Sequence, residues 1–169
     1  STIVKYFQLK QNYELSIEMG RPELITEEKL SVLSHFGTTN LSINPQTLHD
    51  DTLLKINRRH TRADFYHAFE KVNQYTEAKV NVDLIIGLID ENQKIYHNTL
   101  SEVLGLAPHF ITIHTLCAKR GARGYYHNEA NDNLDISTIS QMWQFTYDYL
   151  NWNNYQPYYL YRQKRMVAP

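Results

Sequence analysis

Four short segments rich in apolar and β-branched residues are spaced along the chain. They are Tyr13–Glu18, Asn40–Asn44, Val80–Ile86 and Phe110–Leu116. Their apolar residues either alternate with polar residues or follow one another directly, as in strands buried on one or both faces. The pattern therefore predicts four β-strands.

The segments between and after these strands have the periodicity of helices. Two of them begin at residues that can cap a helix: Thr26, and Thr61 with Asp64 in the spacing of a capping box. Behind both caps, apolar residues recur every three or four positions. The same spacing marks residues 95–104 and 136–150, so four helices are predicted.

Strands and helices alternate at intervals of about thirty residues, which is typical of βαβ units in a parallel sheet. Right-handed crossovers would place all the helices on one outer face of a curved sheet. We therefore expect an α/β fold in which residues 1–169 form a single domain. Four strands are too few to close a barrel, so the prediction is a partial (β/α) barrel. The polar segment 121–133 is expected to be a loop, and residues 155–163 to be a fifth strand or an aromatic tail.

The composition narrows the class of protein. The chain has 169 residues, with 17 Lys and Arg against 18 Asp and Glu, for a net charge of −1. This balance creates no overall field that would attract nucleic acid or an anionic membrane. No apolar run approaches the ~20 residues of a membrane-spanning helix, and no signal peptide opens the chain. We expect a cytoplasmic protein without nucleic-acid or membrane partners.

Polar side chains occur at the C-terminal ends of the predicted strands, where parallel α/β folds place their active-site residues. Glu18 and Gln46 come at the ends of the first and second predicted strands, Arg58 follows the second, and Asp83 lies in the third. Arginine forms paired hydrogen bonds with a carboxylate, and carboxylates accept hydrogen bonds from ammonium or hydroxyl groups. The set suits a small zwitterionic ligand.

Each of these residues also has a purely structural interpretation. Glu18 could cap a neighbouring helix, Gln46 could satisfy the amides of a turn, and Arg58 could lie at a solvated helix end. Asp83 gives the strongest signal, because a charge within the apolar segment Val80–Ile86 must find partners or remain costly to bury. A structural salt bridge is the alternative for Asp83.

Five blocks of residues together carry a family resemblance. They read SIEMGRP at 16–22, INPQT at 43–47, NRRHT at 57–61, VDLIIGL at 82–88 and HTLCAKR at 114–120. Their order and spacing resemble the radical S-adenosylmethionine (radical SAM) enzymes, in the branch of oxygen-independent coproporphyrinogen III oxidase. The ending YYLYRQK resembles the HemZ-type members of that branch.

The resemblance implies that this chain is the second part of a (β/α)6 barrel. In the family, the first strand leads to a CxxxCxxC motif that holds a 4Fe–4S cluster, and the second leads to a glycine-rich turn. Neither motif is present here, and the single cysteine, Cys117, cannot replace three cluster ligands. We therefore expect residues 1–169 to lack the cluster-binding part and to be inactive alone. No metal ligand is assigned to this chain.

The resemblance also implies which residues contact S-adenosylmethionine. Glu18 matches the acid that contacts this cofactor after the family's third strand. Gln46, Arg58 and Asp83 match residues that hold its carboxylate and ribose. The contact after the family's sixth strand falls near Cys117, through the backbone.

The implied activity is that of a radical SAM oxidoreductase in haem biosynthesis. The reduced cluster cleaves S-adenosylmethionine, and the 5′-deoxyadenosyl radical takes a hydrogen from a propionate of coproporphyrinogen III, which then loses carbon dioxide. The partner of such an enzyme is a porphyrinogen-type substrate. This chain would contribute positioning and exclusion of water, while the cofactors supply the chemistry. Some relatives carry haem instead, and the sequence leaves that role open.

Two other classes of function compete with this one. The first is a metal-dependent hydrolase or lyase on a barrel rim, with Glu18, Asp83, His60 and His114 as ligands of a divalent metal. The second is a non-catalytic half-barrel that self-associates through exposed sheet edges and an apolar barrel interior.

Overall fold

A computed structural model describes residue 6 and residues 13–116 and 136–159 of the chain. Strands and helices alternate along the described part, as the sequence predicts. The strands are β1 (Ser16–Gly20), β2 (Asn40–Gln46), β3 (Lys79–Ile86) and β4 (Phe110–Thr115). The helices are the 3₁₀ turn η1 (Pro22–Leu24), α2 (Glu27–His35), α3 (Asp50–Lys55), α4 (Arg62–Tyr75), α5 (Gln93–Gly105) and α6 (Ile136–Trp152).

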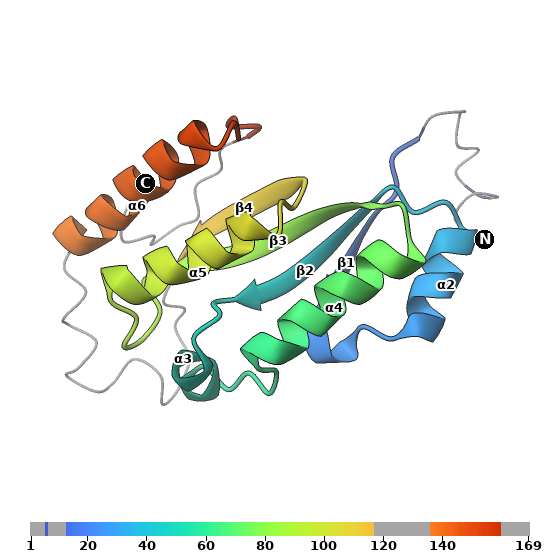
Figure 1. Cartoon of the computed structure of the whole chain (residues 1–169), viewed down its shortest axis with the longest axis horizontal. Coiled ribbons are helices and arrows are strands. Elements are labelled where there is room, and N and C mark those ends of the chain that lie inside the picture. The colour runs from blue at the N-terminus through green and yellow to red at the C-terminus, as the bar shows by residue number, and fades with distance from the viewer. Residues whose placement is uncertain (1–5, 7–12, 117–135, 160–169) are drawn as a thin grey trace.

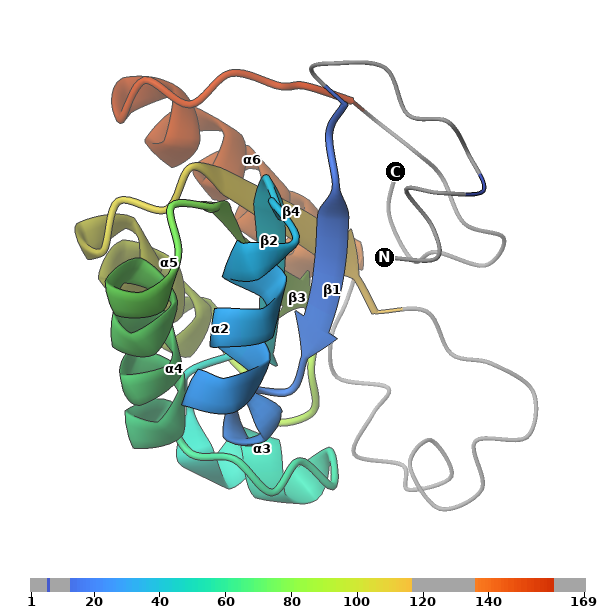
Figure 2. The ribbon, with the colours of Figure 1, turned by 90° about the vertical axis from the view of Figure 1, so that its right-hand side faces the viewer.

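The four strands form one parallel sheet in the order β1-β2-β3-β4 (Figure 1). Each strand therefore lies beside the next one in sequence, which is the arrangement of a curved (β/α) sheet before closure. The helices α2, α4, α5 and α6 lie on the same side of this sheet, and α3 lies beyond the carboxyl ends of the strands (Figure 2). The predicted α/β fold, a partial barrel with its helices on one outer face, is confirmed.

The face of the sheet that meets the helices is apolar. Side chains alternate between the two faces of a strand, so every second residue points toward the helices. Those from the middle strands are almost completely buried and pack with the apolar sides of α4, α5 and α6. They are Leu41, Ile43, Val80, Val82, Leu84 and Ile86. This face is the hydrophobic core.

The opposite face of the sheet is polar, which corrects one expectation. The second competing function assumed an apolar barrel interior. Instead, most residues that alternate with the core positions carry hydroxyl, amide, carboxylate or imidazole groups, many of them hydrogen-bonded across strands, with Ile85 and the 40% exposed Phe110 as apolar exceptions. They include Ser16, Glu18, Asn40, Ser42, Asn44, Asn81, Asp83, Thr112 and His114. The side of the sheet without described helices thus offers mainly hydrogen-bonding groups instead of an apolar surface that would favour self-association.

Helix starts follow the predicted caps. The Thr26 hydroxyl accepts a hydrogen bond from the amide of Lys29 at the start of α2. At the start of α4 the full capping box is present, because Thr61 accepts from the Asp64 amide while the Asp64 carboxylate accepts from the Thr61 amide. These contacts satisfy amides that have no partner within the helix.

Replacing Thr61 with alanine is expected to lower the free energy of unfolding by about 1–2 kcal/mol, because an N-terminal amide of α4 loses its acceptor. Denaturant unfolding measures the loss. Ser31→Ala, at an exposed position inside α2, is the matched control and should change stability by less than about 0.5 kcal/mol. Equal losses in the two variants would contradict the capping role.

Several boundaries differ from the predicted ones. The first strand covers Ser16–Gly20 instead of Tyr13–Glu18, and the short helix α3 was not predicted. Residues 155–159 form no strand, and the predicted loop 121–133 lies outside the described residues. No helix within the described ranges is both long and apolar enough to cross a membrane.

Candidate functional site

Asp83 is the centre of the polar face. It lies in β3, and its carboxylate accepts hydrogen bonds from the Asn81 amide at 2.6 Å and from the Ser42 hydroxyl at 3.4 Å. The other carboxylate oxygen lies 3.5 Å from Nε2 of His114 on β4. The Asp83 side chain is 13% exposed, so it remains accessible. Neighbouring strands thus hold a carboxylate in one orientation on an open face.

Two further hydrogen bonds fix the orientation of the Asn81 side-chain amide that donates to this carboxylate. The same Asn81 amide nitrogen donates to the Ser42 hydroxyl at 2.6 Å, and the Asn81 amide oxygen accepts from Thr112 on β4 at 2.9 Å. The network therefore joins β2, β3 and β4 on the polar face. The amide and hydroxyl donors of this network are uncharged, so they orient Asp83 without neutralising it, whereas the His114 imidazole carries a positive charge only when protonated.

Glu18 lies on the same face, on the edge strand β1. Its carboxylate accepts a hydrogen bond from the Asn44 amide of β2 at 3.2 Å. The side-chain oxygen of Asn44 is buried and has no hydrogen-bond partner within the described residues. Glu18 and Asn44 together offer oxygen acceptors to a donor group such as an ammonium.

Gln46 ends β2 in an unusual backbone conformation. Its φ angle is +72°, in the left-handed region that non-glycine residues rarely adopt, and the residue is buried. The sheet register shifts between Ile43 and Gln46, so the chain leaves the regular ladder there. Backbone outliers of this kind are held by the surrounding structure and cluster at functional sites.

The residue after Gln46 is tied to a buried carboxylate. The Thr47 hydroxyl donates to Oε1 of Glu91, at 2.5 Å, and Glu91 is only 1% exposed. Burial raises the pKa of Glu91 from 4.5 to about 7, although the Thr47 hydrogen bond opposes this shift. Glu91 thereby connects the loop after β3 to the end of β2.

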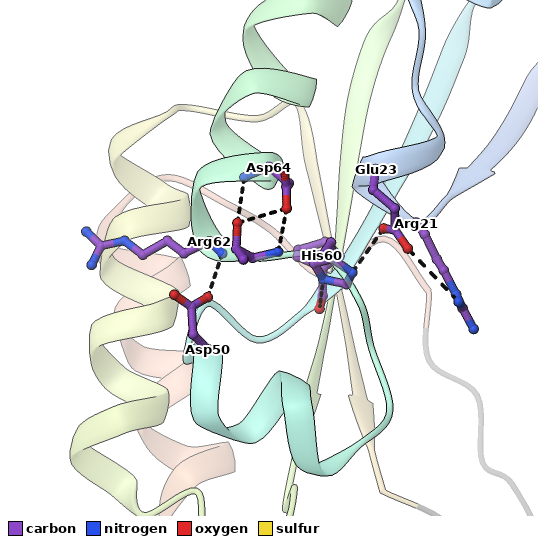
Figure 3. A network of polar contacts seen from close by, with 8 residues as sticks. Arg21, Glu23, Asp50, His60, Arg62 and Asp64 are labelled. Atoms are coloured by element: carbon purple, nitrogen blue, oxygen red, sulfur yellow. Dashed lines mark hydrogen bonds and ion pairs between the residues drawn. The ribbon is translucent and has the colours of Figure 1, made fainter.

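Arg58 lies in the loop between α3 and α4, next to charged groups from the end of β1. It is half-buried, and its pKa is lowered by desolvation and by the nearby Arg21, while Glu23 acts in the opposite direction. Two residues later, His60 is 2% exposed and contacts both the Pro45 carbonyl and the Glu23 carboxylate (Figure 3). This cluster joins the carboxyl ends of β1 and β2.

The predicted residues lie in two groups. Glu18 and Asp83 lie on the polar face, whereas Gln46 ends β2 and Arg58 lies in the loop between α3 and α4. Three of the four thus belong to strands of one parallel sheet, and Arg58 belongs to a loop beside Arg21 and Glu23. Cys117, the fifth predicted contact, lies outside the described residues.

The four ligands of the rival metal site do not form a cluster. Asp83 and His114 are neighbours, but Glu18 is bound to Asn44, and both nitrogens of His60 face other groups. No group of three or more His, Cys, Asp or Glu side chains in the described part of the chain is arranged to hold a metal ion. The geometry therefore does not favour a metal-dependent hydrolase.

Sequence reasoning missed several participants in the site, among them Asn81, Asn44 and Glu91. Asn81 and Asn44 alternate with apolar residues in the strands, and that alternation was a usable signal for the polar face. Glu91 lies in a polar loop where an acidic residue is ordinary, so nothing in the sequence marks its burial.

This fold and site correspond to a known family. A family model described as the Radical SAM superfamily matches residues 3–103. The chain belongs to this superfamily. The resemblance seen in the sequence blocks is thereby confirmed.

Relatives of this chain include a coproporphyrinogen-III oxidase-like protein and a heme chaperone. The chain is 36% identical over 160 residues to the oxygen-independent coproporphyrinogen-III oxidase-like protein HemZ of Bacillus subtilis, covering 95% of this chain and 32% of HemZ. It is 29% identical over 103 residues to the heme chaperone HemW of the same organism, covering 61% of this chain and 27% of HemW. The chain thus spans about a third of the length of these relatives.

Two solved structures share the fold. Coproporphyrinogen III oxidase HemN of Escherichia coli superimposes with a TM-score of 0.68 at 21% identity, over 87% of this chain and 34% of HemN. Elp3 of Methanocaldococcus infernus superimposes with a TM-score of 0.60 at 18% identity, over 78% of this chain and 28% of the Elp3 chain. At these identities the similarity shows a shared fold and nothing about activity.

The donor set of this chain fits one of the family's two cofactors. S-adenosylmethionine carries an ammonium, a carboxylate and ribose hydroxyls, which suit the carboxylates of Glu18 and Asp83 and the guanidinium of Arg58. The partnerless oxygen of Asn44 adds an acceptor beside Glu18. A 4Fe–4S cluster requires several thiolates, and the one cysteine of this chain cannot supply them.

Proposed function

We propose that this chain forms the S-adenosylmethionine-binding part of a radical SAM oxidoreductase that acts on a porphyrinogen. The observation that carries the proposal is the polar face of the sheet, where hydrogen bonds from neighbouring strands hold Asp83 and Glu18 in open positions. A buried carboxylate can be satisfied by neutral hydrogen-bond donors as well as by an ion pair, and Asp83 also lies 3.5 Å from Nε2 of His114. Neither carboxylate has an arginine or lysine partner within the described residues.

In this proposal each side chain binds one part of the cofactor. Glu18 and the oxygen of Asn44 accept hydrogen bonds from the ammonium group. Asp83 accepts hydrogen bonds from the ribose hydroxyls. Arg58 binds the carboxylate with two parallel hydrogen bonds, and the amide of Gln46 adds a donor. Cys117 would contribute a backbone contact.

The chemistry itself comes from the cofactors. When bound together, S-adenosylmethionine and a reduced 4Fe–4S cluster supply a radical that removes a hydrogen atom from the substrate. The residues of this chain hold the adenosylmethionine in one orientation against the polar face of the sheet, which lowers the entropic cost of bringing it to the reacting groups. The cluster ligands must come from outside these 169 residues, so we propose that the chain is inactive alone.

The substrate class follows from the relatives. HemZ is named as coproporphyrinogen-III oxidase-like, and oxygen-independent coproporphyrinogen III oxidase of Synechocystis is 28% identical over 113 residues. We therefore propose oxidative decarboxylation of coproporphyrinogen III in haem biosynthesis. The similarity to HemW makes haem binding without turnover the competing outcome of the tests.

Asp83→Asn is expected to weaken S-adenosylmethionine binding by about 10- to 100-fold, because a hydrogen bond to a charged group contributes roughly 1.5–3 kcal/mol. The measurement is equilibrium dialysis with labelled S-adenosylmethionine on the full-length protein, after anaerobic assembly of the cluster. Asp148→Asn is the matched control, since this partly exposed aspartate accepts hydrogen bonds only from Gln144 of its own helix among the described residues. Unchanged affinity in Asp83→Asn would remove the proposed site.

The substrate proposal has its own experiment. The full-length protein with its cluster is incubated anaerobically with coproporphyrinogen III and S-adenosylmethionine, and the products are separated by chromatography. Formation of vinyl-containing porphyrinogen together with 5′-deoxyadenosine supports the oxidase function. Stoichiometric haem binding without conversion of the porphyrinogen would instead support a haem-carrier function and contradict the oxidase function.

A further inference from the structure

A buried histidine connects the ends of two strands behind the proposed cofactor site. Nε2 of His60 lies 3.1 Å from the carbonyl oxygen of Pro45, the residue before Gln46. On the other side of the ring, Nδ1 lies 3.3 Å from Oε2 of Glu23, in the turn η1 after β1. The His60 side chain is completely buried, while that of Glu23 is 24% exposed (Figure 3).

The chemistry of these contacts fixes where protons must be. A carbonyl oxygen can only accept, so Nε2 of His60 carries a hydrogen and donates it to Pro45. In neutral histidine, Nδ1 is then an acceptor and faces a carboxylate oxygen that also only accepts. Neither Nδ1 nor Oε2 of Glu23 has any other hydrogen-bond partner within the described residues, and both atoms are buried. Two acceptors at this distance repel each other unless a proton lies between them.

We propose that His60 and Glu23 share one buried proton, and that this protonated pair positions Gln46 and Arg58 for S-adenosylmethionine. The positioning role rests on the proposed function, whereas the shared proton does not. The pair acts through the backbone, since His60 holds the carbonyl that precedes Gln46 and follows Arg58 by two residues. His60 is therefore a positioning residue and does not itself contact the cofactor.

The charges around the pair determine how firmly the proton is held. Arg58 disfavours a positive charge on His60, while Glu23 and Asp64 of α4 favour it. Arg21 lies 4.0 Å from the other oxygen of Glu23. The pKa of His60 is lowered overall, because burial outweighs the Pro45 hydrogen bond and the contact with Glu23, which both raise it. The pair consequently loses its proton as pH rises, and the repulsion that remains loosens the connection.

The shared proton is tested by NMR on the full-length protein with ¹⁵N-labelled histidine. Comparison with the variant His60→Gln assigns the His60 signals among the 8 histidines of this chain. In the wild type, the Nδ1 signal should change with pH while Nε2 keeps its hydrogen. In Glu23→Gln, the side-chain amide can donate to Nδ1, so His60 should stay neutral and its signals should be constant from about pH 5 to 9. Identical titration of His60 in both proteins would overturn the proposal.

The positioning role is tested by S-adenosylmethionine affinity as a function of pH, in the full-length protein with its cluster. Wild-type affinity should fall by about five- to tenfold as the pair loses its proton, which is a usual size for coupling between sites. Glu23→Gln should abolish this pH dependence, whereas Glu28→Gln, at an exposed position of α2, should keep it. His60→Gln retains a donor for Pro45 and should give weakened, pH-independent binding.

The two measurements separate the possible failures. Flat wild-type affinity, with normal titration of His60, would refute the positioning role and leave the shared proton standing. Absence of any S-adenosylmethionine binding would refute the proposed function, and the NMR titration would still decide whether the proton is shared.

Discussion

Replacing Phe65 with alanine is expected to lower the free energy of unfolding by about 3–5 kcal/mol, the usual range for a phenylalanine in a packed core. Phe65 is completely buried in α4, and its ring contacts those of Tyr66 and Phe69. The truncation removes apolar surface from the core and leaves a cavity between α4 and the sheet.

The size of this effect is measured by denaturant unfolding against Phe36→Ala. Phe36 follows α2 and is 39% exposed, so its loss should change stability by roughly 1 kcal/mol or less. The Phe65 variant should also bind the cofactor more weakly. The reason is that the segment with Arg58 and His60 leads directly into α4, so a loosened helix also loosens this segment. Equal stability losses at the two positions would show that α4 does not depend on this core contact.

The difference in stability between the wild type and Glu91→Gln is expected to change by roughly 2–3 kcal/mol between pH 5 and pH 8. Burial raises the pKa of Glu91 from 4.5 to about 7. Between these values the folded chain keeps a proton that the unfolded chain has released. The contribution of Glu91 to stability is therefore greatest below pH 4.5 and is lost as pH rises through 7.

Glutamine keeps the acceptor for Thr47 but cannot ionise, so Glu91→Gln removes this pH dependence. Its amide takes the place of Oε2, which has no hydrogen-bond partner in the described chain, and adds a constant penalty at all pH values. Free energies of unfolding at several pH values give the difference directly. Glu77→Gln, at an exposed position, should follow the wild-type curve. A constant difference between wild type and Glu91→Gln would contradict the raised pKa.

The strands and long helices could be predicted because their signals are local. Runs such as Val80–Ile86 have few alternatives once they are flanked by helical periodicity, and the capping box at Thr61 marks a helix start directly. The short helix α3 has no such signal: it has six residues and no side-chain cap at His49. The predicted limits of the first strand differ from those of β1 because pairing with β2 sets them, and this pairing begins at Ser16 of β1.

The site could be predicted only where a residue conflicts with its surroundings. Asp83 was identified because a charge within an apolar strand needs partners. Its actual partners, Ser42 and Asn81, depend on how β2 and β3 pair, which one sequence does not contain. His60 was considered as a metal ligand from its residue type alone. Its buried position between Pro45 and Glu23 exists only after three separate segments have folded together.

The polar face of the sheet affects how this protein behaves when its inner side is uncovered. Exposed apolar sheets stack on one another, whereas this surface already satisfies many of its own groups through contacts such as Ser42 with Asn81 and Thr112 with Asn81. Water can wet it at little free-energy cost. We therefore expect little aggregation through the polar face when it is exposed to solvent. Aggregation should instead follow unfolding that exposes the core between the sheet and the helices.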